Sequence, residues 1–352
     1  MRRFPLFFSV LIGLASTFPV SAQEEAIVRR ESISTAMAIA YYVCDDALKE
    51  VKLLQKEIDG FIASPTELNL ALAKLSWVGS RLPYLQARGF TWIDSNGLGS
   101  DMFRSTLDSR PVAMDEIEGI VTDAKQFPTI DAASLRKASR ELEGKTISGF
   151  GALEALMWST GDKDHLPFQP SDPHGKRRGA YLKACAAMLE EDLSGLTVEF
   201  IPDSEANTRA RMKAMEPDIA IINLMNGLAR FLSSEVLEAR LTLADDPLYL
   251  SHTSHFDVLH CVAGIGNVLA GAYVGTDQEL KIQGTGLLAA FNDEDDDNRQ
   301  SELRDAVNNA IKGAHRLPRP LSIALESKEE EHVQRIEECR DALKRLIEVL
   351  SR

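Results

Sequence analysis

The sequence lacks the motifs of the common nucleotide-dependent and hydrolytic enzymes. It has no GxxxxGK[ST] loop, no GxGxxG fingerprint, no GxSxG and no HExxH. It is also poor in positive charge, with 39 Lys and Arg against 53 Asp and Glu and a formal net charge of −14. A chain of this balance would be repelled by phosphate backbones, so we exclude nucleic acid as a partner.

Long apolar runs are scarce as well, and the one that is present lies at the N-terminus. It covers residues 4–20, follows Arg2 and Arg3, and ends in Val20-Ser21-Ala22, with small residues at the positions that a signal peptidase reads. We predict a cleavable signal peptide over residues 1–22 and a periplasmic location. The alternative is an uncleaved anchor, but the run contains two prolines and is barely long enough to span a bilayer. Cleavage would leave 37 basic and 53 acidic residues, a formal charge of −16.

Cysteine is rare, and no two cysteines are close in sequence. The four are Cys44, Cys185, Cys261 and Cys339, so there is no CxxC pair and no zinc-ribbon or thioredoxin motif. An exported protein can form disulfides, but each cysteine also stands among apolar residues at helical spacing, where a free thiol packs as a small core residue. The sequence leaves the pairing open.

Sustained alternation of apolar and polar residues is missing too, which argues against a sheet. Apolar residues instead recur at steps of three and four, the spacing of a helix face. The first such stripe is Ile33, Met37, Ala40, Cys44, Ala47, Val51, Leu54 and Ile58. After Gly60, Ser64-Pro65-Thr66-Glu67 reads as a capping box that opens a second helix, with Leu68, Leu72, Leu75, Val78 and Leu82 predicted to face inward.

Further helical stripes follow to the C-terminus. They cover residues 111–125, 131–158, 178–196, 208–242, 254–273, 278–290, 299–314 and 327–351. Residues 161–176, which contain three prolines, read as a loop, and residues 200–207 read as a boundary. We predict an all-α fold of two antiparallel helical-bundle halves, residues 23–200 and 201–352. The acidic run 292–298 lacks the pattern of an EF-hand and is interpreted as a solvated loop.

The predicted helix 131–158 has an unusual centre. Gly149 and Gly151 would each cost about 1 kcal/mol relative to alanine, which indicates that a backbone or a ligand approaches closely there. Glu154 shares a face with apolar residues, so its carboxylate should be buried and therefore paired. The pairing could be a structural ion pair with Arg81 or Arg240, or Glu154 could be a metal or substrate ligand.

Two other segments offer polar candidates. Trp77 lies one turn before Arg81, which could bind an anion or a carboxylate, although an arginine whose stem packs while its head reaches water is equally compatible. Residues 252–260 gather three histidines and Asp257, a combination that can bind a transition metal. The same residues can instead form a helix start, with Ser254 and Asp257 as a capping box.

Several of these segments together resemble the imelysin-like family, also known as M75 peptidases, which includes iron-regulated exported bacterial proteins. The resemblance rests on Trp77–Phe90, on Ser148–Trp158 beside the family motif GxHxxE, on Arg178–Leu182, on Ser234–Arg240 and on Ser251–Tyr273. It implies an all-helical exported protein with a role in iron uptake or iron-responsive physiology, and peptidase activity in some members.

The chain departs from the family motif at one position. Gly151 stands where the motif has histidine, whereas Gly149 and Glu154 match it. A glycine offers no side-chain ligand, so half of the His and Glu metal site that the resemblance implies is missing. We therefore expect a non-enzymatic binding protein, with a metallopeptidase or an envelope scaffold as the alternatives.

The expected ligand is iron, another divalent metal or a small iron complex, held between the halves. Other envelope proteins are possible partners. The candidate binding residues are Trp77, Arg81, Gly149, Glu154, Trp158, Arg240, His255 and Asp257, with Glu154 and His255 as the candidate metal ligands.

Overall fold

The computed structural model describes residues 22–93, 100–142, 144–159, 161–241, 250–291 and 297–352. Apart from Ala22, the predicted signal peptide lies outside the described residues, as does most of the acidic run 292–298. No helix in the described ranges is both long and apolar enough to cross a membrane.

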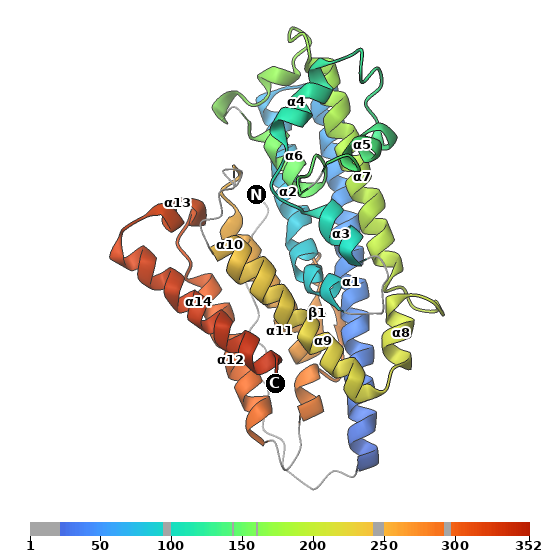
Figure 1. The fold of residues 1–352 in the computed structure, drawn as a ribbon, viewed down its shortest axis with the longest axis vertical. Coiled ribbons are helices and arrows are strands. Elements are labelled where there is room, and N and C mark those ends of the chain that lie inside the picture. Colours follow the sequence, from blue (N-terminus) through green and yellow to red (C-terminus); the bar gives the residue numbers. More distant parts are fainter. Residues whose placement is uncertain (1–21, 94–99, 143, 160, 242–249, 292–296) are drawn as a thin grey trace.

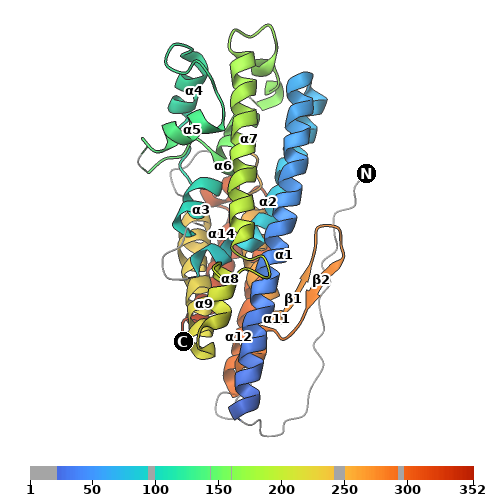
Figure 2. The same ribbon diagram turned by 90° about the vertical axis from the view of Figure 1, so that its right-hand side faces the viewer.

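The fold is built around one long helix, α1 (Ala22–Ala63), which runs along much of the molecule (Figures 1 and 2). Helices α2 (Glu67–Ala87) and α7 (Gly175–Val198) pack against it, and Figure 2 shows α1 and α7 side by side. In the second half of the chain, α12 (Asp297–His315) packs between α11 (Ser254–Ala270) and α14 (Glu330–Leu350). The predicted all-α fold of helical bundles is confirmed.

Shorter elements connect these helices. They are the 3-10 helix η1 (Arg88–Trp92), α3 (Ser100–Leu107), α4 (Met114–Thr122), α5 (Ala132–Ser139), α6 (Gly149–Met157), the 3-10 turns η2 (Gly161–Lys163) and η3 (Leu166–Phe168), α8 (Thr208–Ala214), α9 (Pro217–Phe231), the π-helix η4 (Leu232–Glu238), α10 (Ala239–Leu241), β1 (Ala272–Val274), β2 (Leu280–Gln283), the 3-10 helix η5 (Leu287–Phe291) and α13 (Leu321–Glu326). The proposed boundary of the halves, residues 200–207, falls in the connection between α7 and α8.

The predicted inner face of α1 is confirmed along its whole length. All eight residues of the stripe from Ile33 to Ile58 are buried. The helix continues past Gly60 to Ala63, because a glycine alone costs about 1 kcal/mol and the packing on α2 and α7 outweighs it.

The predicted inner face of α2 is wrong at three of its five positions, whereas Val78 and Leu82 are half-buried. Leu68, Leu72 and Leu75 are exposed, and the helix buries Leu70, Ala73, Trp77, Arg81 and Tyr84 instead. The start is also displaced, since the N-cap is Thr66, whose side chain accepts from the Asn69 amide, and not Ser64. The leucine spacing misled the prediction because the true inner face of this helix carries an arginine and small residues.

This correction can be tested by stability. Leu70→Ala should lower the free energy of unfolding by about 2 to 3 kcal/mol, because Leu70 is buried, whereas Leu72→Ser should change it by less than about 0.5 kcal/mol. Urea unfolding of both variants measures the difference. The opposite order would restore the face predicted from the leucine spacing.

Three other predicted helices also differ from the structure. The segment 131–158 is broken into α5 and α6, and the segment 208–242 is divided into α8, α9, η4 and α10. The segment 278–290 is not one helix: it contains β2, which pairs antiparallel with β1, and only its end lies in the 3-10 helix η5. Gly271, with φ of 75°, ends α11 before this hairpin, and the Tyr273 hydroxyl donates to buried Asp46 on α1 at 3.0 Å. These tertiary contacts hold a hairpin where the periodicity favoured a helix.

Candidate functional site

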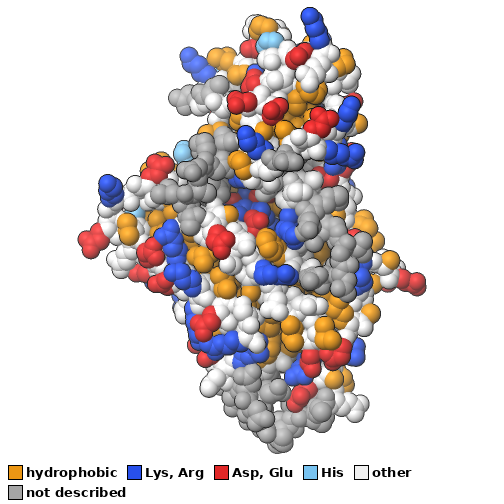
Figure 3. All heavy atoms as spheres, in the orientation of Figure 1, with side chains coloured by type: hydrophobic (Ala, Val, Ile, Leu, Met, Phe, Trp, Pro, Cys, Tyr) orange, Lys and Arg blue, Asp and Glu red, His pale blue; other side chains and the backbone are white. Residues whose placement is uncertain are grey.

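Six charged side chains meet where the two predicted halves come together. Three are arginines and three are carboxylates: Arg81 on α2, Arg88 in η1, Asp108 after α3, Glu235 in η4, Arg240 in α10 and Asp257 on α11. We call them the Arg–carboxylate cluster. Figure 3 shows the face of the molecule hollowed in the region between α10 and α2, with Lys or Arg and Asp or Glu side chains in the hollow.

Asp108 is the centre of the cluster. Its Oδ2 accepts from Arg88 Nη1 at 3.0 Å, from Arg81 Nη2 at 3.1 Å and from Arg240 Nη2 at 3.3 Å. Its other oxygen, Oδ1, is buried without a hydrogen-bond partner among the described residues. Burial alone would raise the Asp108 pKa, but the guanidiniums of Arg81, Arg88 and Arg240 together hold it well below its usual range.

The other two carboxylates close the cluster on different sides. Asp257 Oδ2 accepts from Arg81 Nη2 at 2.7 Å and from Arg240 Nε at 3.2 Å, and this side chain is buried. Glu235 Oε2 accepts from Arg88 Nη2 at 2.5 Å and from Arg240 Nη1 at 3.2 Å. The Glu235 side chain is 21% exposed, whereas those of Arg88 and Arg240 are 3% and 4% exposed. Glu235 is thus the member of the cluster that reaches solvent.

The π-helix η4 explains how Glu235 and Arg240, which are five residues apart, can form an ion pair with each other. Residues five apart lie on different faces of a regular α-helix, but the hydrogen bonds of a π-helix link residues i and i+5. Arg240 Nη1 also donates to the backbone oxygen of Glu235. Such π segments are frequent at functional sites, so η4 is consistent with a functional role for this part of the cluster.

Glu154 is buried, as its spacing predicted, but its partner is neither Arg81 nor Arg240. Its Oε2 accepts from Arg110 Nη2 at 2.5 Å. Its Oε1 accepts from the Ser251 amide at 2.9 Å and from the Ser251 hydroxyl at 2.5 Å. Glu154 therefore joins α6 to the segment before α11, in an ion pair separate from the Arg–carboxylate cluster.

The glycines of this segment permit a close backbone approach, as expected. Gly149 has φ of 75°, and a Cβ built on it would lie 2.5 Å from the carbonyl oxygens of Thr106 and Leu107. A Cβ on Gly151 would lie 3.0 Å from Val112 Cγ2 and 3.9 Å from Arg110 Cζ. The approaching group is thus the chain segment 106–112 and not a separate ligand.

Trp77 and Trp158 are parts of the core beside this ion pair. Trp77 is fully buried, donates from Nε1 to the Phe150 carbonyl oxygen at 3.1 Å, and lies edge-on to Trp158 at 5.1 Å between ring centroids. The guanidinium of Arg81 lies over the Trp77 ring at 5.0 Å. Trp77 thus packs directly against Arg81, and Trp158 packs against Trp77.

The family model described as imelysin, peptidase M75, matches residues 38–350. The chain belongs to the imelysin family. The predicted resemblance is therefore confirmed, and the family match includes α6, η4 and α11, which carry the charged residues described above. No curated protein matches the chain.

Solved structures of imelysin-like proteins share the fold. One is described as a candidate iron-regulated protein A precursor from Parabacteroides distasonis ATCC 8503, with a TM-score of 0.68, 19% identity, and coverage of 91% of this chain and 93% of that one. Another is an imelysin-like protein from Psychrobacter arcticum 273-4, with a TM-score of 0.58, 13% identity, and 95% coverage of both chains. At these identities the likeness shows the fold alone.

The metal site that the family motif implies does not fit the residues of this chain. Gly151 has no side chain, and both oxygens of Glu154 accept from Arg110 or Ser251. In the part of the chain that the structure describes, no group of three or more His, Cys, Asp or Glu could hold a metal ion. The proposed pairing of Glu154 with His255 as metal ligands finds no support in this arrangement.

His255 lies near one cation, Arg319, and one carboxylate, Asp257. Burial lowers its pKa, and the charge of Arg319 lowers it further, although Asp257 opposes this effect. His255 Nδ1 is buried without a hydrogen-bond partner among the described residues. A guanidinium nearby disfavours a second cation, so the region around His255 suits a neutral imidazole better than a bound metal. The predicted capping box is not formed, because the N-cap of α11 is Thr253 and makes no side-chain cap.

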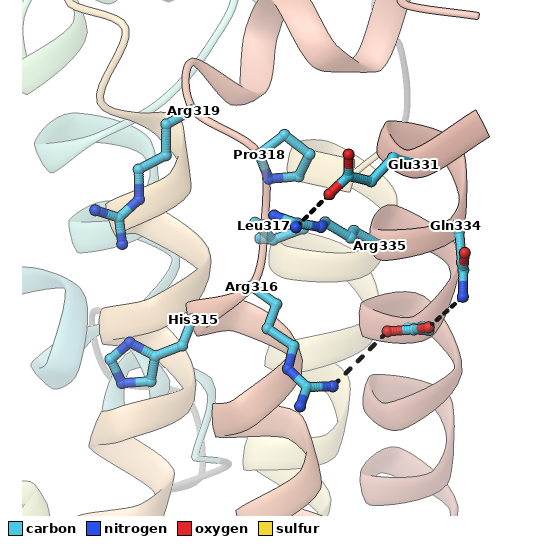
Figure 4. Close-up of a pocket in the computed structure, with 9 residues that line it drawn as sticks. His315, Arg316, Leu317, Pro318, Arg319, Glu331, Gln334 and Arg335 are labelled. Atoms are coloured by element: carbon cyan, nitrogen blue, oxygen red, sulfur yellow. Dashed lines mark hydrogen bonds and ion pairs between the residues drawn. The ribbon is translucent and has the colours of Figure 1, made fainter. Parts of the chain in front are cut away.

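A separate groove of about 600 Å³ lies between the end of α12 and α14 (Figure 4). Figure 4 shows His315 and Arg319 pointing to one side of it, away from Arg316. Arg335 is paired with Glu331 across one turn of α14, and Arg316 lies 4.0 Å from Glu338. None of the candidate residues predicted from the sequence lines this groove.

Four charged residues of the site were not among the predicted candidates. They are Arg88, Asp108, Arg110 and Glu235. Arg88 could have been found, because it lies two helical turns after Arg81 and continues the same face. Asp108 and Arg110 lie in a connection without periodicity, and no local signal marks them.

The four cysteines are free and buried, which answers the question of pairing for this structure. Burial raises the pKa of Cys185, Cys261 and Cys339 to about 12. They are core residues and are not poised as nucleophiles.

Proposed function

We propose that this imelysin-family protein is an exported, non-enzymatic binding protein that takes an anionic iron complex into the hollow between α2 and α10. The observation that carries the proposal is the position of Glu235. It is 21% exposed and covers the guanidiniums of Arg88 and Arg240, which are otherwise buried. A carboxylate of a ligand could replace the carboxylate of Glu235 on the same two arginines.

The charge balance of the cluster selects the ligand. Its three arginines face three carboxylates, so it is formally neutral. If Glu235 turned into solvent, one positive charge would remain uncompensated in a buried position, which is unfavourable unless an anion enters. Arginine presents planar pairs of N–H donors that match a carboxylate, so we expect the ligand to carry free carboxylates.

Iron is proposed as the cargo because of the family. A solved structure with this fold is described as a candidate iron-regulated protein A precursor. The carboxylates of the cluster are already engaged by arginines, so iron would arrive coordinated by its own chelator and not as a bare ion. The N-terminal sequence supports export, and periplasmic location is part of the proposal.

A metallopeptidase is the weaker proposal. It needs a metal with about three protein ligands and an open position for water. Gly151 supplies no ligand and Glu154 is paired with Arg110, so the motif region is arranged as a structural contact.

Thermal unfolding with ferric citrate tests the proposed function. We expect ferric citrate to raise the melting temperature of the protein, since a ligand at 100 times its Kd stabilises the folded state by about 2.7 kcal/mol. Glu235→Gln removes the competing carboxylate and should tighten binding about tenfold. Arg88→Lys keeps the charge but loses the planar pair of donors, and should weaken binding about tenfold.

Glu118→Gln is the matched control, because Glu118 pairs with Arg178 outside the cluster. It should bind ferric citrate as the unaltered protein does. If neither the unaltered protein nor Glu235→Gln responds to ferric citrate, the proposed function is wrong. A response to citrate alone, with no difference on adding iron, would retain the carboxylate site and remove iron as the cargo.

A further inference from the structure

The segment that carries Arg110 occupies space that a side chain at residue 151 would need. A Cβ on Gly151 would lie 3.9 Å from Arg110 Cζ, 3.4 Å from the Ser109 carbonyl oxygen and 3.0 Å from Val112 Cγ2. Residues 109–112 therefore lie directly against the backbone of α6 at the position of Gly151. A Cβ on Gly151 would be crowded by Val112 and Ser109, and a longer side chain there would compete for space with the segment that carries Arg110.

The segment that carries Arg110 is held in place by backbone hydrogen bonds. The Ala113 amide donates to the Thr146 carbonyl oxygen at 2.8 Å, and the Thr146 amide donates to the Pro111 carbonyl oxygen at 3.0 Å. Val112 and Thr146 form a short parallel bridge. The segment with Arg110 is thus held against Thr146, which precedes α6 in the chain. The Arg110 side chain is 13% exposed, and that of Glu154 is 1% exposed.

The carboxylate of Glu154 is satisfied on both oxygens by this arrangement. Arg110 Nη2 lies 2.5 Å from Oε2, and the amide and hydroxyl of Ser251 lie 2.9 Å and 2.5 Å from Oε1. The Ser251 hydroxyl is in turn 2.8 Å from the Thr253 hydroxyl. A buried carboxylate needs a cation or several donors, and here a guanidinium supplies the positive charge.

We infer that Arg110 is a built-in cation that takes the place of a metal ion at Glu154, and that the absence of a side chain at residue 151 lets the segment that carries Arg110 lie against α6. The guanidinium ties the segment 109–112 to α6 through Glu154, and it supplies the positive charge that a divalent ion bound by Glu154 and a histidine at residue 151 would supply. The site shares no residue with the Arg–carboxylate cluster, so its zinc test is separate from the ferric citrate test of the carboxylate exchange proposed for Glu235.

The inference predicts that a divalent-cation site can be recovered by reversing the exchange. The double variant Arg110→Ala with Gly151→His removes the guanidinium and adds an imidazole beside Glu154. In equilibrium dialysis against excess zinc, this variant should bind more zinc than the unaltered protein, although its two protein ligands hold zinc less tightly than a complete site would. Its melting temperature should rise with zinc, and adding Glu154→Gln should remove both effects. The single variant Arg110→Ala should gain a smaller stabilisation by zinc, which keeps the test open if the double variant does not fold.

Two controls separate this role from an ordinary ion pair. Arg178→Ala removes the partner of the more exposed Glu118 and should not create a zinc response. Arg110→Lys keeps a cation and should also show none. The inference is overturned if the unaltered protein already binds zinc in a manner that depends on Glu154. It is also overturned if removing Arg110, with or without the histidine, produces no response to zinc.

Discussion

Asp108→Asn is expected to lower the free energy of unfolding by about 3 to 5 kcal/mol, an effect of the size seen when one partner is removed from a buried charge network. The Asp108 carboxylate is fully buried, and one of its oxygens accepts from three guanidiniums. An amide of nearly the same shape would leave these three cations with only the carboxylates of Asp257 and Glu235. The loss of stability is therefore electrostatic and does not come from a change in side-chain volume.

Urea unfolding at pH 7 measures this effect, and Asp59→Asn is the control. Asp59 pairs with Lys183 at 2.7 Å, but both side chains are more than half exposed, so its loss should cost less than about 1 kcal/mol. Because arginines hold the Asp108 pKa below its usual range, its contribution is present above the unfolded pKa of about 3.8 and is lost only as the pH falls through the lower folded value. The difference between the unaltered protein and Asp108→Asn should therefore stay constant between pH 5 and pH 8. Equal losses from the two substitutions would show that the cluster does not hold the halves together.

The helices could be predicted where a long run of apolar residues lies on one helix face. The stripe from Ile33 to Ile58 is buried throughout because α1 packs against helices on several sides. In α2 the same reasoning failed, since the leucines at 68, 72 and 75 are exposed while Arg81 is buried. An arginine on an inner face is stable only because Asp108 and Asp257 are there to pair with it. That pairing depends on residues 27 and 176 positions further along the chain, which no local pattern reveals.

The candidate site could be predicted only in part, because its contacts also join residues that are far apart in the chain. Arg81, Arg240 and Asp257 were chosen from their local settings, and the structure brings them together in one cluster. Glu154 was correctly placed in the interior, but its partner Arg110 lies in an irregular connection between α3 and α4. The π-helix that turns Glu235 toward Arg88 has no clear signature in sequence periodicity. Contacts made by the connections between helices and by irregular helices thus could not be predicted from periodicity.

His260 is expected to make the stability of the protein fall as the pH is lowered from 6.5 toward 4. The pKa of His260 is lowered from 6.5 to about 4, chiefly by burial, with Asp257 opposing the shift and the nearby His315 and His255 adding to it. Gln86 Nε2 lies 3.3 Å from His260 Nδ1, and Gln86 Oε1 accepts from Asn267 at 2.8 Å, which orients the glutamine as a donor to a neutral ring. The folded state therefore favours the uncharged imidazole.

The sign of the effect follows from proton linkage. Above pH 6.5 the imidazole is neutral in both states, so its contribution is fully present. Between pH 6.5 and about 4 the unfolded chain binds the proton first, and stability is lost as the pH falls. At 1.36 kcal/mol per pKa unit the whole loss is about 3 kcal/mol, of which roughly 2.5 kcal/mol should appear between pH 7.5 and pH 4.5.

Comparing His260→Gln with the unaltered protein isolates this contribution from that of the carboxylates, which titrate in both. The urea unfolding free energy of the variant should fall by roughly 2.5 kcal/mol less between pH 7.5 and pH 4.5, whatever the substitution costs at pH 7.5. The same replacement at His332, whose side chain is 32% exposed on α14, should leave most of the pH dependence in place. If His260→Gln keeps the full dependence, the histidine does not titrate as its burial requires. The acid sensitivity would then have to come from elsewhere in the chain, because arginines keep Asp108 ionised throughout this range.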